Sequence, residues 1–424
     1  MEILALFAVF ALLLVLGVPV AFAIAASTLT TILMLGLPPV VVVQQVAAGF
    51  GKVSLLAIPL FIFAGELMLR GGISERLIAL ASSLVGHLRG GLGQVSVVAS
   101  TLFGGVSGSA LADVSAIGST LIPQMEKRGF SKDYAVDVTI SAALVALLLP
   151  PSHNLILFSA VAGGASIADL FAAGIIPALL LAIGVMAAAY LLARARGYPT
   201  EAFPGLAAVG ARLVAAIPGL LLIVVIFGGI RAGIFTAVES AAIAVLYALL
   251  VTAVVYRSMP WPAFKGAVAH AARASGAILF VIGAAGAFGW LLAYLEIPAM
   301  AVDALQGVTH EKHLMLLLML VVLLVLGTFM DLAPMIIICT PIFLPVARAY
   351  GVDPLHFGVI LVLAAGIGLI TPPVGSVLFV GAAIGRISIA EAMRSIWPFY
   401  LAAIAVLLLV TFVPALSLTL PALF

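Results

Sequence analysis

Charged residues are scarce in this chain of 424 residues: lysine, arginine, aspartate and glutamate together make up 8% of it, whereas 65% of the residues are hydrophobic. So few charges cannot cover a set of water-soluble domains, which excludes an ordinary soluble protein of this length. The 18 basic and 16 acidic residues nearly balance, so the chain also lacks the basic surface that nucleic-acid binding requires. The composition predicts a polytopic helical membrane protein that is solvated mostly by lipid.

The sequence has one cysteine, Cys339, which excludes internal disulfides and metal sites built from several cysteines. It contains neither GxxxxGK[ST] nor HExxH, which excludes a P-loop ATPase and a protease of the HExxH type. The apolar stretch from Met1 to about Ala26 has no basic residue ahead of it. We therefore expect it to be the first membrane-spanning helix rather than a cleaved signal peptide. Active transport by this chain would have to draw on an ion gradient or on a partner.

Prolines and glycines recur along the chain at one fixed offset. Gly105 is matched by Gly327, which lies 222 positions later, and the same offset places Pro150-Pro151 on Pro372-Pro373. Further matches join Pro123 to Pro345, Gly129 to Gly351, Gly163 to Gly385, and residues 166–168 to residues 388–390. Because proline and glycine determine backbone shape rather than hydrophobicity, the matches predict two copies of one structural unit.

Each copy contains an apolar run interrupted by small polar residues, and then a second apolar run that ends in a double proline. In lipid, such breaks in a helix are tolerated only where the backbone lines a buried or wet cavity. Paired breaks at matching positions of two halves are typical of the binding site of a secondary transporter, near the middle of the membrane. We predict an all-α polytopic membrane protein with two inverted structural repeats, each with a re-entrant helical hairpin and a broken helix.

The breaks offer oxygen atoms that suit a small cation. Residues 104–113 include three glycines and two serines, whose carbonyl and hydroxyl oxygens are ligands suited to Na⁺. The alternative is close packing of helices through small residues. Each double proline frees carbonyls one turn upstream, at Ala146 and Leu149 in the first copy and at Gly368 and Thr371 in the second. The alternative there is an ordinary loop at the membrane surface.

Asp331 lies in the second break, at the position that Ser109 occupies in the first. An ionisable residue at that depth is costly and indicates contact with an ion or a substrate; the alternative is a structural role, satisfied by backbone N–H groups. Asp113 either caps or lines the first break. Four arginines are candidates to pair with a substrate carboxylate, and spacing does not choose among them: Arg70, Arg231, Arg348 and Arg386.

The chain resembles the DctM-type large membrane subunit of tripartite ATP-independent periplasmic (TRAP) transporters over nearly its whole length. The resemblance rests on six segments: 17–22 (GVPVAF), 57–68 (AIPLFIFAGELM), 104–113 (GGVSGSALAD), 150–152 (PPS), 233–236 (GIFT) and 371–375 (TPPVG). It implies an elevator-type importer, not an enzyme, that couples two or more Na⁺ ions to the uptake of organic acid anions such as C4-dicarboxylates or sialic acid. The implied location is the inner membrane of a bacterium or archaeon.

The resemblance also implies two protein partners, a periplasmic substrate-binding protein (DctP type) and a small four-helix membrane subunit (DctQ type), here expected as a separate chain. The Na⁺ ligands that it implies are Ser107, Ser109, Ala146, Leu149 and Pro151 in the first repeat and Gly327, Thr328, Gly368, Thr371 and Pro373 in the second. The expected substrate contacts are Gly108, Asp113, Ser152, Asn154, Asp331 and Ser376.

An elevator needs a fixed frame and a moving core. We expect the frame to comprise residues 1–91 and 213–313, with 193–212 as a connecting loop, and the core to comprise repeats 92–192 and 314–424, the second including a C-terminal helix. Residues 73–90 and 261–273 read as amphipathic helices along the membrane interface. An ion exchanger such as a Na⁺/H⁺ antiporter is the alternative function, although it should carry a pair of acids on broken helices. An intramembrane enzyme would need a third catalytic residue beside Ser152 and His153.

Overall fold

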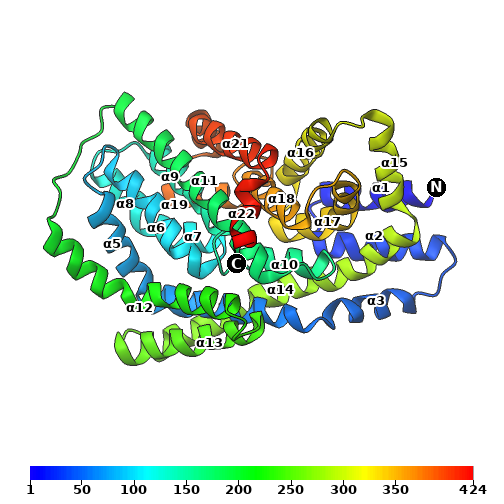
Figure 1. The fold of residues 1–424 in the computed structure, drawn as a ribbon, viewed down its shortest axis with the longest axis horizontal. Coiled ribbons are helices and arrows are strands. Elements are labelled where there is room, and N and C mark those ends of the chain that lie inside the picture. The colour runs from blue at the N-terminus through cyan, green and yellow to red at the C-terminus, as the bar shows by residue number, and fades with distance from the viewer. Residues whose placement is uncertain (424) are drawn as a thin grey trace.

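The computed structural model describes residues 1–423. Phe424, the last residue of the second predicted repeat, lies outside the described residues, as does the side chain of Val106. Within residues 1–423 the chain is helical, with connecting turns and no strand (Figure 1). Seven of these helices are long and apolar enough to cross a membrane, and nine spans result if each of two sharply bent helix pairs counts as one. The prediction of an all-α polytopic membrane protein is confirmed.

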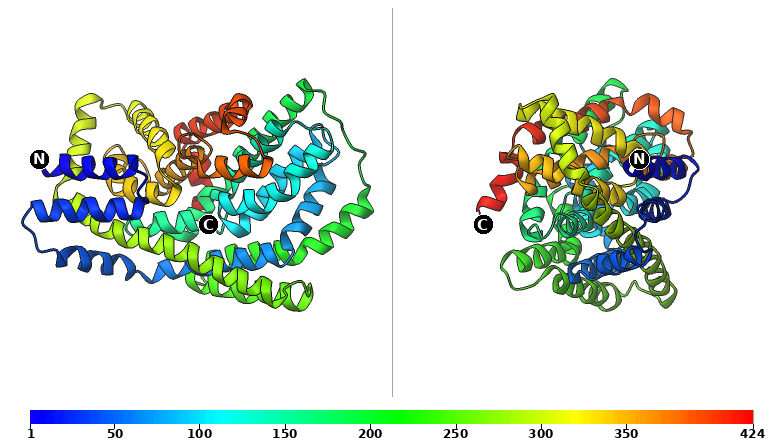
Figure 2. Two further views of the ribbon diagram at one scale, coloured as in Figure 1. Left: turned by 180° about the vertical axis from the view of Figure 1, so that it is seen from behind. Right: turned by 90° about the vertical axis from the view of Figure 1, so that its right-hand side faces the viewer.

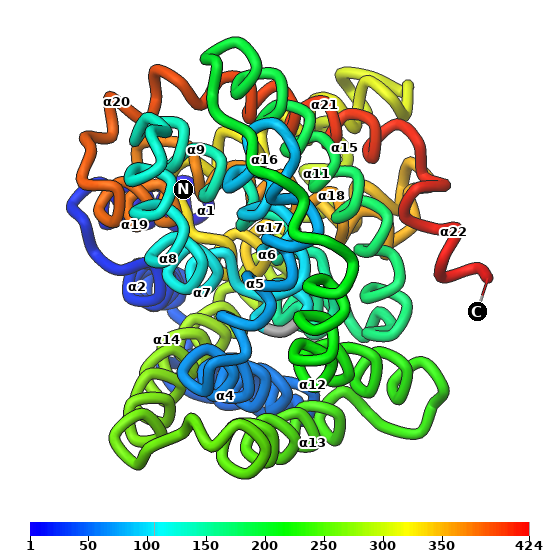
Figure 3. Tube along the Cα trace, turned by 90° about the vertical axis from the view of Figure 1, so that its left-hand side faces the viewer, coloured from blue at the N-terminus to red at the C-terminus, as the bar shows by residue number. Residues whose placement is uncertain are grey.

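Several helices of one group lie together along one side of the molecule (Figure 3). Its members are α1 (Glu2–Val15), α2 (Val20–Met34), α3 (Val40–Phe50), η1 (Val53–Leu56), α4 (Ala57–Arg70), α5 (Ile73–Val85), α12 (Leu206–Arg231), α13 (Ala237–Leu249), η4 (Leu250–Val255), α14 (Trp261–Tyr294) and α15 (Ile297–Val308). The long helix α14 packs against α2, α3 and α4, and α4 also packs against α13. We call this group the frame.

Two helices of the frame cross the direction of the others. Figure 1 shows α5 and α15 steeply inclined at opposite ends of the molecule. The predicted amphipathic segment 73–90 contains α5. The expectation of a separate interfacial helix over 261–273 was wrong, because these residues are the first turns of α14, which has 34 residues. At 1.5 Å per residue α14 is about 51 Å long, more than the roughly 30 Å hydrocarbon core, so it is longer than an upright span requires.

The remaining helices form two copies of one unit, which we call the core. The first copy comprises α6 (Gly91–Ser107), α7 (Ala110–Asp113), η2 (Val114–Gly118), α8 (Ser119–Lys127), α9 (Lys132–Ala143), η3 (Leu144–Leu147), α10 (His153–Val161) and α11 (Ile167–Ala195). The second comprises α16 (Lys312–Phe329), α17 (Leu332–Ala349), α18 (Pro354–Leu369), α19 (Ser376–Gly385), α20 (Ile389–Ser395), α21 (Trp397–Phe412) and α22 (Ala415–Leu423).

The offset found in the sequence also relates the helix boundaries. The first residues of α7, α9 and α11 are Ala110, Lys132 and Ile167; those of α17, α18 and α20 lie 222 positions later. The copies differ at their ends, since α11 is one helix of 29 residues whereas its counterpart is divided into α20, α21 and α22. Pro398 and Pro414 stand at these divisions, where a proline interrupts helical hydrogen bonding.

The two hairpins reach the centre of the molecule from opposite ends (Figures 1 and 2). One consists of α6 and the return segment α7–η2–α8; the other consists of α16 and α17. The helices that follow the hairpins are central, because α18 is buried at every residue from His356 to Leu369 and α9 from Tyr134 to Ala143. Helix α10 of the first copy packs against α17 of the second, and α19 packs against α9 and η2. Each copy therefore packs against helices of the other copy, as expected for two inverted repeats.

Candidate functional site

The tip of the first hairpin is a tight turn between α6 and α7. Gly108 ends α6 with φ of +57°, a conformation that residues with a Cβ adopt at a cost. Ser109 caps the returning helix, since its Oγ accepts a hydrogen bond from the N–H of Ala112 at 3.3 Å. The sequence Ser-Gly-Ser therefore folds into a reversal that leaves polar backbone atoms at the tip.

The tip touches the first double-proline loop, which joins η3 to α10. A Cβ added to Gly108 would lie 2.6 Å from the carbonyl oxygen of Pro151, and one added to Gly104 would lie 2.6 Å from Cα of Ala146. Asn154 closes the contact, because its Nδ2 donates to the carbonyl oxygen of Gly108 at 3.0 Å. The structure thus brings together the two breaks of the first repeat, which the whole of α8 and α9 separates along the chain.

The second repeat has the same arrangement. A Cβ on Gly368 would lie 2.3 Å from the carbonyl oxygen of Gly327, and the N–H of Val374 donates to the carbonyl oxygen of Thr328 at 3.0 Å. The hydroxyl of Thr328 donates to Val325 at 2.8 Å and that of Thr371 donates to Ile367 at 2.7 Å. Because both hydroxyl hydrogens are engaged, the oxygen lone pairs stay available to accept.

The oxygen atoms of these two contacts fit a hard monovalent cation better than a transition metal. Within residues 1–423 no group of three or more histidine, cysteine, aspartate or glutamate side chains is placed to hold a metal ion, whereas both contacts consist of carbonyl and hydroxyl groups. Leu149 lies partly buried in the first loop, and Pro373 lies exposed in the second. The ten predicted Na⁺ ligands are divided equally between the two repeats, and their role stays a prediction.

A cavity of about 590 Å³ lies between the core and the frame. Four predicted site residues line it from the core: Ser107, Ser109, Asn154 and Asp331. His153, which the sequence presented only as a neighbour of the double proline, lines it as well. The cavity therefore receives the tips of both hairpins and the start of α10.

Asp331 caps α17 at the edge of this cavity. Its Oδ1 accepts hydrogen bonds from the N–H of Leu332 at 3.0 Å and from the hydroxyl of Ser376 at 3.2 Å. The side chain thus joins the second hairpin to the start of α19. Two of the predicted substrate contacts, Asp331 and Ser376, are direct neighbours.

Asp113 and Ser152 point into the protein rather than into the cavity in this conformation. Asp113 is fully buried, and its Oδ2 accepts from the hydroxyl of Ser100 at 2.6 Å. Ser152 is equally buried and donates to the carbonyl oxygen of Leu147 at 2.5 Å. These contacts stabilise the first hairpin and the first loop.

The frame contributes three polar side chains that the sequence did not single out as a group. Glu66 and Arg70 lie one turn apart on α4, and His270 lies on α14. Oε2 of Glu66 is 3.1 Å from Nε of Arg70, and its Oε1 is 2.9 Å from Nδ1 of His270. The available signal was the i, i+4 spacing of two opposite charges in an otherwise apolar helix; the third member is distant in sequence.

The four candidate arginines lie in different surroundings. Arg70 lines the cavity. Arg231 instead donates to Asp169 at 2.6 Å and to the carbonyl oxygen of Pro421. Arg348 lies in the last turn of α17 and Arg386 follows the end of α19, and neither belongs to the cavity wall.

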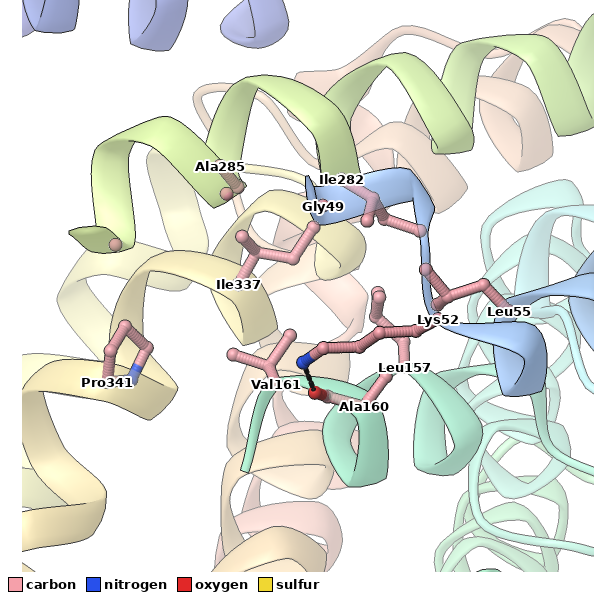
Figure 4. A pocket seen from close by; sticks show the side chains of 12 residues that line it. Gly49, Lys52, Leu55, Leu157, Ala160, Val161, Ile282, Ala285, Ile337 and Pro341 are labelled. Atoms are coloured by element: carbon pink, nitrogen blue, oxygen red, sulfur yellow. Dashed lines mark hydrogen bonds between the residues drawn. The ribbon is translucent and has the colours of Figure 1, made fainter. Parts of the chain in front are cut away.

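A second cavity, of about 260 Å³, lies further along the boundary between frame and core (Figure 4). Lys52, between α3 and η1, projects into it and donates from Nζ to the carbonyl oxygen of Ala160, near the C-terminal end of α10. The opposite wall carries Ile337 and Pro341 of α17. A lysine of the frame therefore binds a carbonyl of the core, at the end of a helix where the dipole favours a cation.

Inverted repeats with two opposed hairpins and broken helices define a class of secondary transporters. The fold is shared with the YdaH transporter of Alcanivorax borkumensis, with a TM-score of 0.60 and 14% sequence identity, covering 88% of this chain and 86% of that one. The family described as "Tripartite ATP-independent periplasmic transporter, DctM component" matches residues 7–416. The chain belongs to this family, so it is a multi-pass membrane transporter component and not an enzyme.

Relatives extend over the whole chain. Protein YgiK of Salmonella typhimurium is 40% identical over 426 residues, which cover 100% of this chain and 98% of that one. The isethionate TRAP transporter permease protein DctMQ of Oleidesulfovibrio alaskensis is 37% identical over 97% of this chain, which spans only 65% of that protein. The C4-dicarboxylate TRAP transporter large permease protein DctM of Rhodobacter capsulatus is 34% identical over 99% of both chains.

Proposed function

We propose that this chain is the large subunit of a Na⁺-coupled secondary importer of organic acid anions, working by an elevator movement of its core. The observation that carries the proposal is the convergence of three helix N-termini on the cavity of about 590 Å³, those of α10, α17 and the return segment α7–η2–α8. Backbone N–H groups at a helix N-terminus, together with the helix dipole, favour a negative charge. This arrangement therefore suits an anionic ligand.

The same geometry supports the proposed cation sites. The carboxylate of Asp331 is on the cavity wall and would repel an organic anion. Cations held by the oxygen atoms around Gly108 and Gly327 would offset that charge beside the substrate. Binding of Na⁺ and of the anion would then favour each other, which is the requirement for coupling one gradient to the other. Two such contacts, related by the repeat, support two or more Na⁺ ions.

The elevator movement is supported by the order of the two cavities. On α14, Ala274 and Ile278 line the larger cavity, and Ile282 and Gly286 line the smaller one a turn or two further on. The same order holds on α17 and on α10. The core thus faces consecutive segments of one frame helix, with unfilled space at both. A slide of the core along α14 would carry the substrate site from one end of this path to the other.

Delivery and location follow the family. We propose that a periplasmic binding protein presents the anion and that a small membrane subunit, as a separate chain, completes the complex in the inner membrane. The fused DctMQ relative is longer than this chain, as expected if it contains such a subunit. The substrate would be a C4-dicarboxylate, a sialic acid or a similar acid, and the binding protein would contribute much of the choice.

Uptake into proteoliposomes tests the proposal. The purified membrane complex is expected to accumulate a radiolabelled anion from the panel succinate, N-acetylneuraminate and isethionate only when the binding protein and an inward Na⁺ gradient are both present. Replacement of Na⁺ by K⁺ is expected to abolish accumulation. Na⁺-driven proton movement without any organic anion would instead identify an ion exchanger, and Na⁺-independent equilibration would identify a channel.

A further inference from the structure

The frame side of the larger cavity holds an arginine in a fixed position. Glu66 is 7% exposed at its side chain and uses both carboxylate oxygens, one toward Arg70 and one toward His270. Because α4 supplies Glu66 and Arg70 whereas α14 supplies His270, the three side chains also join the two helices. The carboxylate therefore determines where the guanidinium lies.

Arg70 keeps most of its donors free. Its Nε faces Glu66, and its two terminal nitrogens have no hydrogen-bond partner within residues 1–423. An arginine carries five N–H donors in a planar fork, so the two terminal groups can bind a carboxylate or a sulfonate through two parallel hydrogen bonds. The side chain is 37% exposed and lines the cavity.

The neighbouring helix leaves room for the guanidinium. A Cβ on Gly266 of α14 would lie 2.8 Å from Nη1 of Arg70, so the arginine packs over a position where only glycine fits without displacing it. His270, one turn later on α14, is the residue that the same glutamate binds. Gly266 thus leaves space for the guanidinium beside α14, and His270 contacts the glutamate that positions it.

The charges around the cavity also favour an anionic ligand. Arg70 is the one lysine or arginine among the described residues that line this cavity, and it lies on the frame, across from the helix N-termini on the core. An organic acid between them would meet N–H dipoles at one end and the guanidinium at the other. Both carboxylate oxygens of Glu66 are engaged, one with Arg70 and one with His270.

We propose that Arg70 binds the anionic group of the transported acid in this conformation, with Glu66 and His270 as positioning residues. The assignment rests on the proposed function and adds to it a substrate contact made by the frame. Since the frame stays in place while the core moves, the contact exists only in conformations where the core faces this end of α14. Arg70 would therefore favour binding at one end of the path and have no part at the other.

Substrate binding to the purified membrane complex tests the assignment without the binding protein. The dissociation constants of succinate, N-acetylneuraminate and isethionate are measured by calorimetry at saturating Na⁺. For whichever anion the wild-type complex binds, Arg70→Gln is expected to raise the constant at least tenfold. Gly266→Ala, which keeps every charge but displaces the guanidinium, is expected to raise it severalfold.

Arg76→Gln is the matched control, because it removes the same charge from the next helix. Arg76 donates to the carbonyl oxygen of Gly72 at 2.6 Å and lies over the ring of Tyr256 at 3.6 Å, away from the cavity wall, so the constant is expected to stay unchanged. Arg70→Gln could misfold because Glu66 loses its arginine partner. In that case the comparison is between Glu66→Gln and the double variant Glu66→Gln/Arg70→Gln, which differ only at Arg70.

The outcomes separate the two proposals. A tenfold weakening with Arg70 removed, absent from the Arg76 control, supports the assignment. Equal constants with and without Arg70, or an equal loss in the control, overturn it while the proposed function stands. A wild-type complex that binds none of the three anions with Na⁺ overturns the proposed function, and the assignment with it.

Discussion

Replacement of Gly108 by alanine should weaken Na⁺ binding in the first repeat. The new Cβ would lie 2.6 Å from the carbonyl oxygen of Pro151 and 3.2 Å from Cα of Ser152, whereas ordinary contacts begin near 3.4 Å. Either the hairpin tip or the double-proline loop must shift by several tenths of an ångström. The shift separates the two groups of oxygen atoms that we expect to hold the ion.

The magnitude has three contributions. Alanine at φ of +57° costs about 1–2 kcal/mol relative to glycine. Overpacking against Pro151 costs about 1–3 kcal/mol more, and loss of the hydrogen bond from Asn154 to the carbonyl oxygen of Gly108 costs about 1 kcal/mol. Gly129 supplies a matched control, because its φ is +84° and a Cβ there would meet nothing within 4 Å. Gly129→Ala thus carries the first cost alone.

The assay is the Na⁺ dependence of anion uptake into proteoliposomes, with thermal unfolding of the same preparations to confirm folding. The difference between the two variants is about 2–4 kcal/mol. If only about 1.4 kcal/mol of this is released when the ion leaves, the half-saturating Na⁺ concentration rises tenfold. Gly129→Ala should keep the wild-type value.

Two results would refute the reasoning. One is a Gly108→Ala protein with an unchanged Na⁺ dependence, since the tip and the loop would then not form the ion site together. The other is an equal change in Gly129→Ala, since the effect would then come from backbone conformation and not from the close approach.

Three further predictions concern other parts of the molecule. Gly368→Ala should abolish Na⁺-driven uptake, because its Cβ would lie 2.3 Å from a backbone oxygen of the second hairpin. The control Gly276→Ala, in open space on α14, should be tolerated, and equal activity of the two variants would contradict the second ion site. Lys52→Met removes the donor that binds the end of α10 and should destabilise this conformation by about 1 kcal/mol, a roughly fivefold shift that spin-label distances between α10 and α14 would detect; an unchanged distance distribution would refute it. Burial acts to raise the pKa of Asp133, but hydrogen bonds from Ser131 and from Arg196, with the charge of that arginine, outweigh it and hold the pKa below its usual value. The resulting stabilisation is present above about pH 4 and is lost as the pH falls further. The thermal midpoint of Asp133→Asn should therefore depend less on pH below 4 than that of the wild type, and parallel curves would exclude the contribution.

The architecture was predictable because it depends on local chemistry. Long apolar runs can be satisfied in lipid only as helices, and the breaks in those runs carry glycine and proline, which impose their backbone shape wherever they occur. The repeat offset therefore survives from Pro150-Pro151 in the sequence to the boundaries of α9 and α18 in the structure. Local chemistry did not predict α14, because an amphipathic start and an apolar continuation look alike whether they form one helix or two.

The candidate site was predictable only in part, for the same reason. Ser107, Ser109 and Asp331 were found because each interrupts an apolar run, and all three line the cavity. Asp113 shows the limit, since its carboxylate is as unexpected in an apolar segment as that of Asp331 but is buried against Ser100. Which of two acids faces a cavity depends on the helix packed against it, and the sequence does not contain that information locally.

What the sequence by itself determined is the solvent, the helical class, the duplication and the places where the helices break, because each follows from residue type and order along the chain. Only the tertiary structure decided that Arg70 and not Arg231 faces the cavity, and that Glu66 binds His270. Those contacts join helices from distant parts of the chain. They exist because the frame and the core pack against each other, and no local preference specifies them.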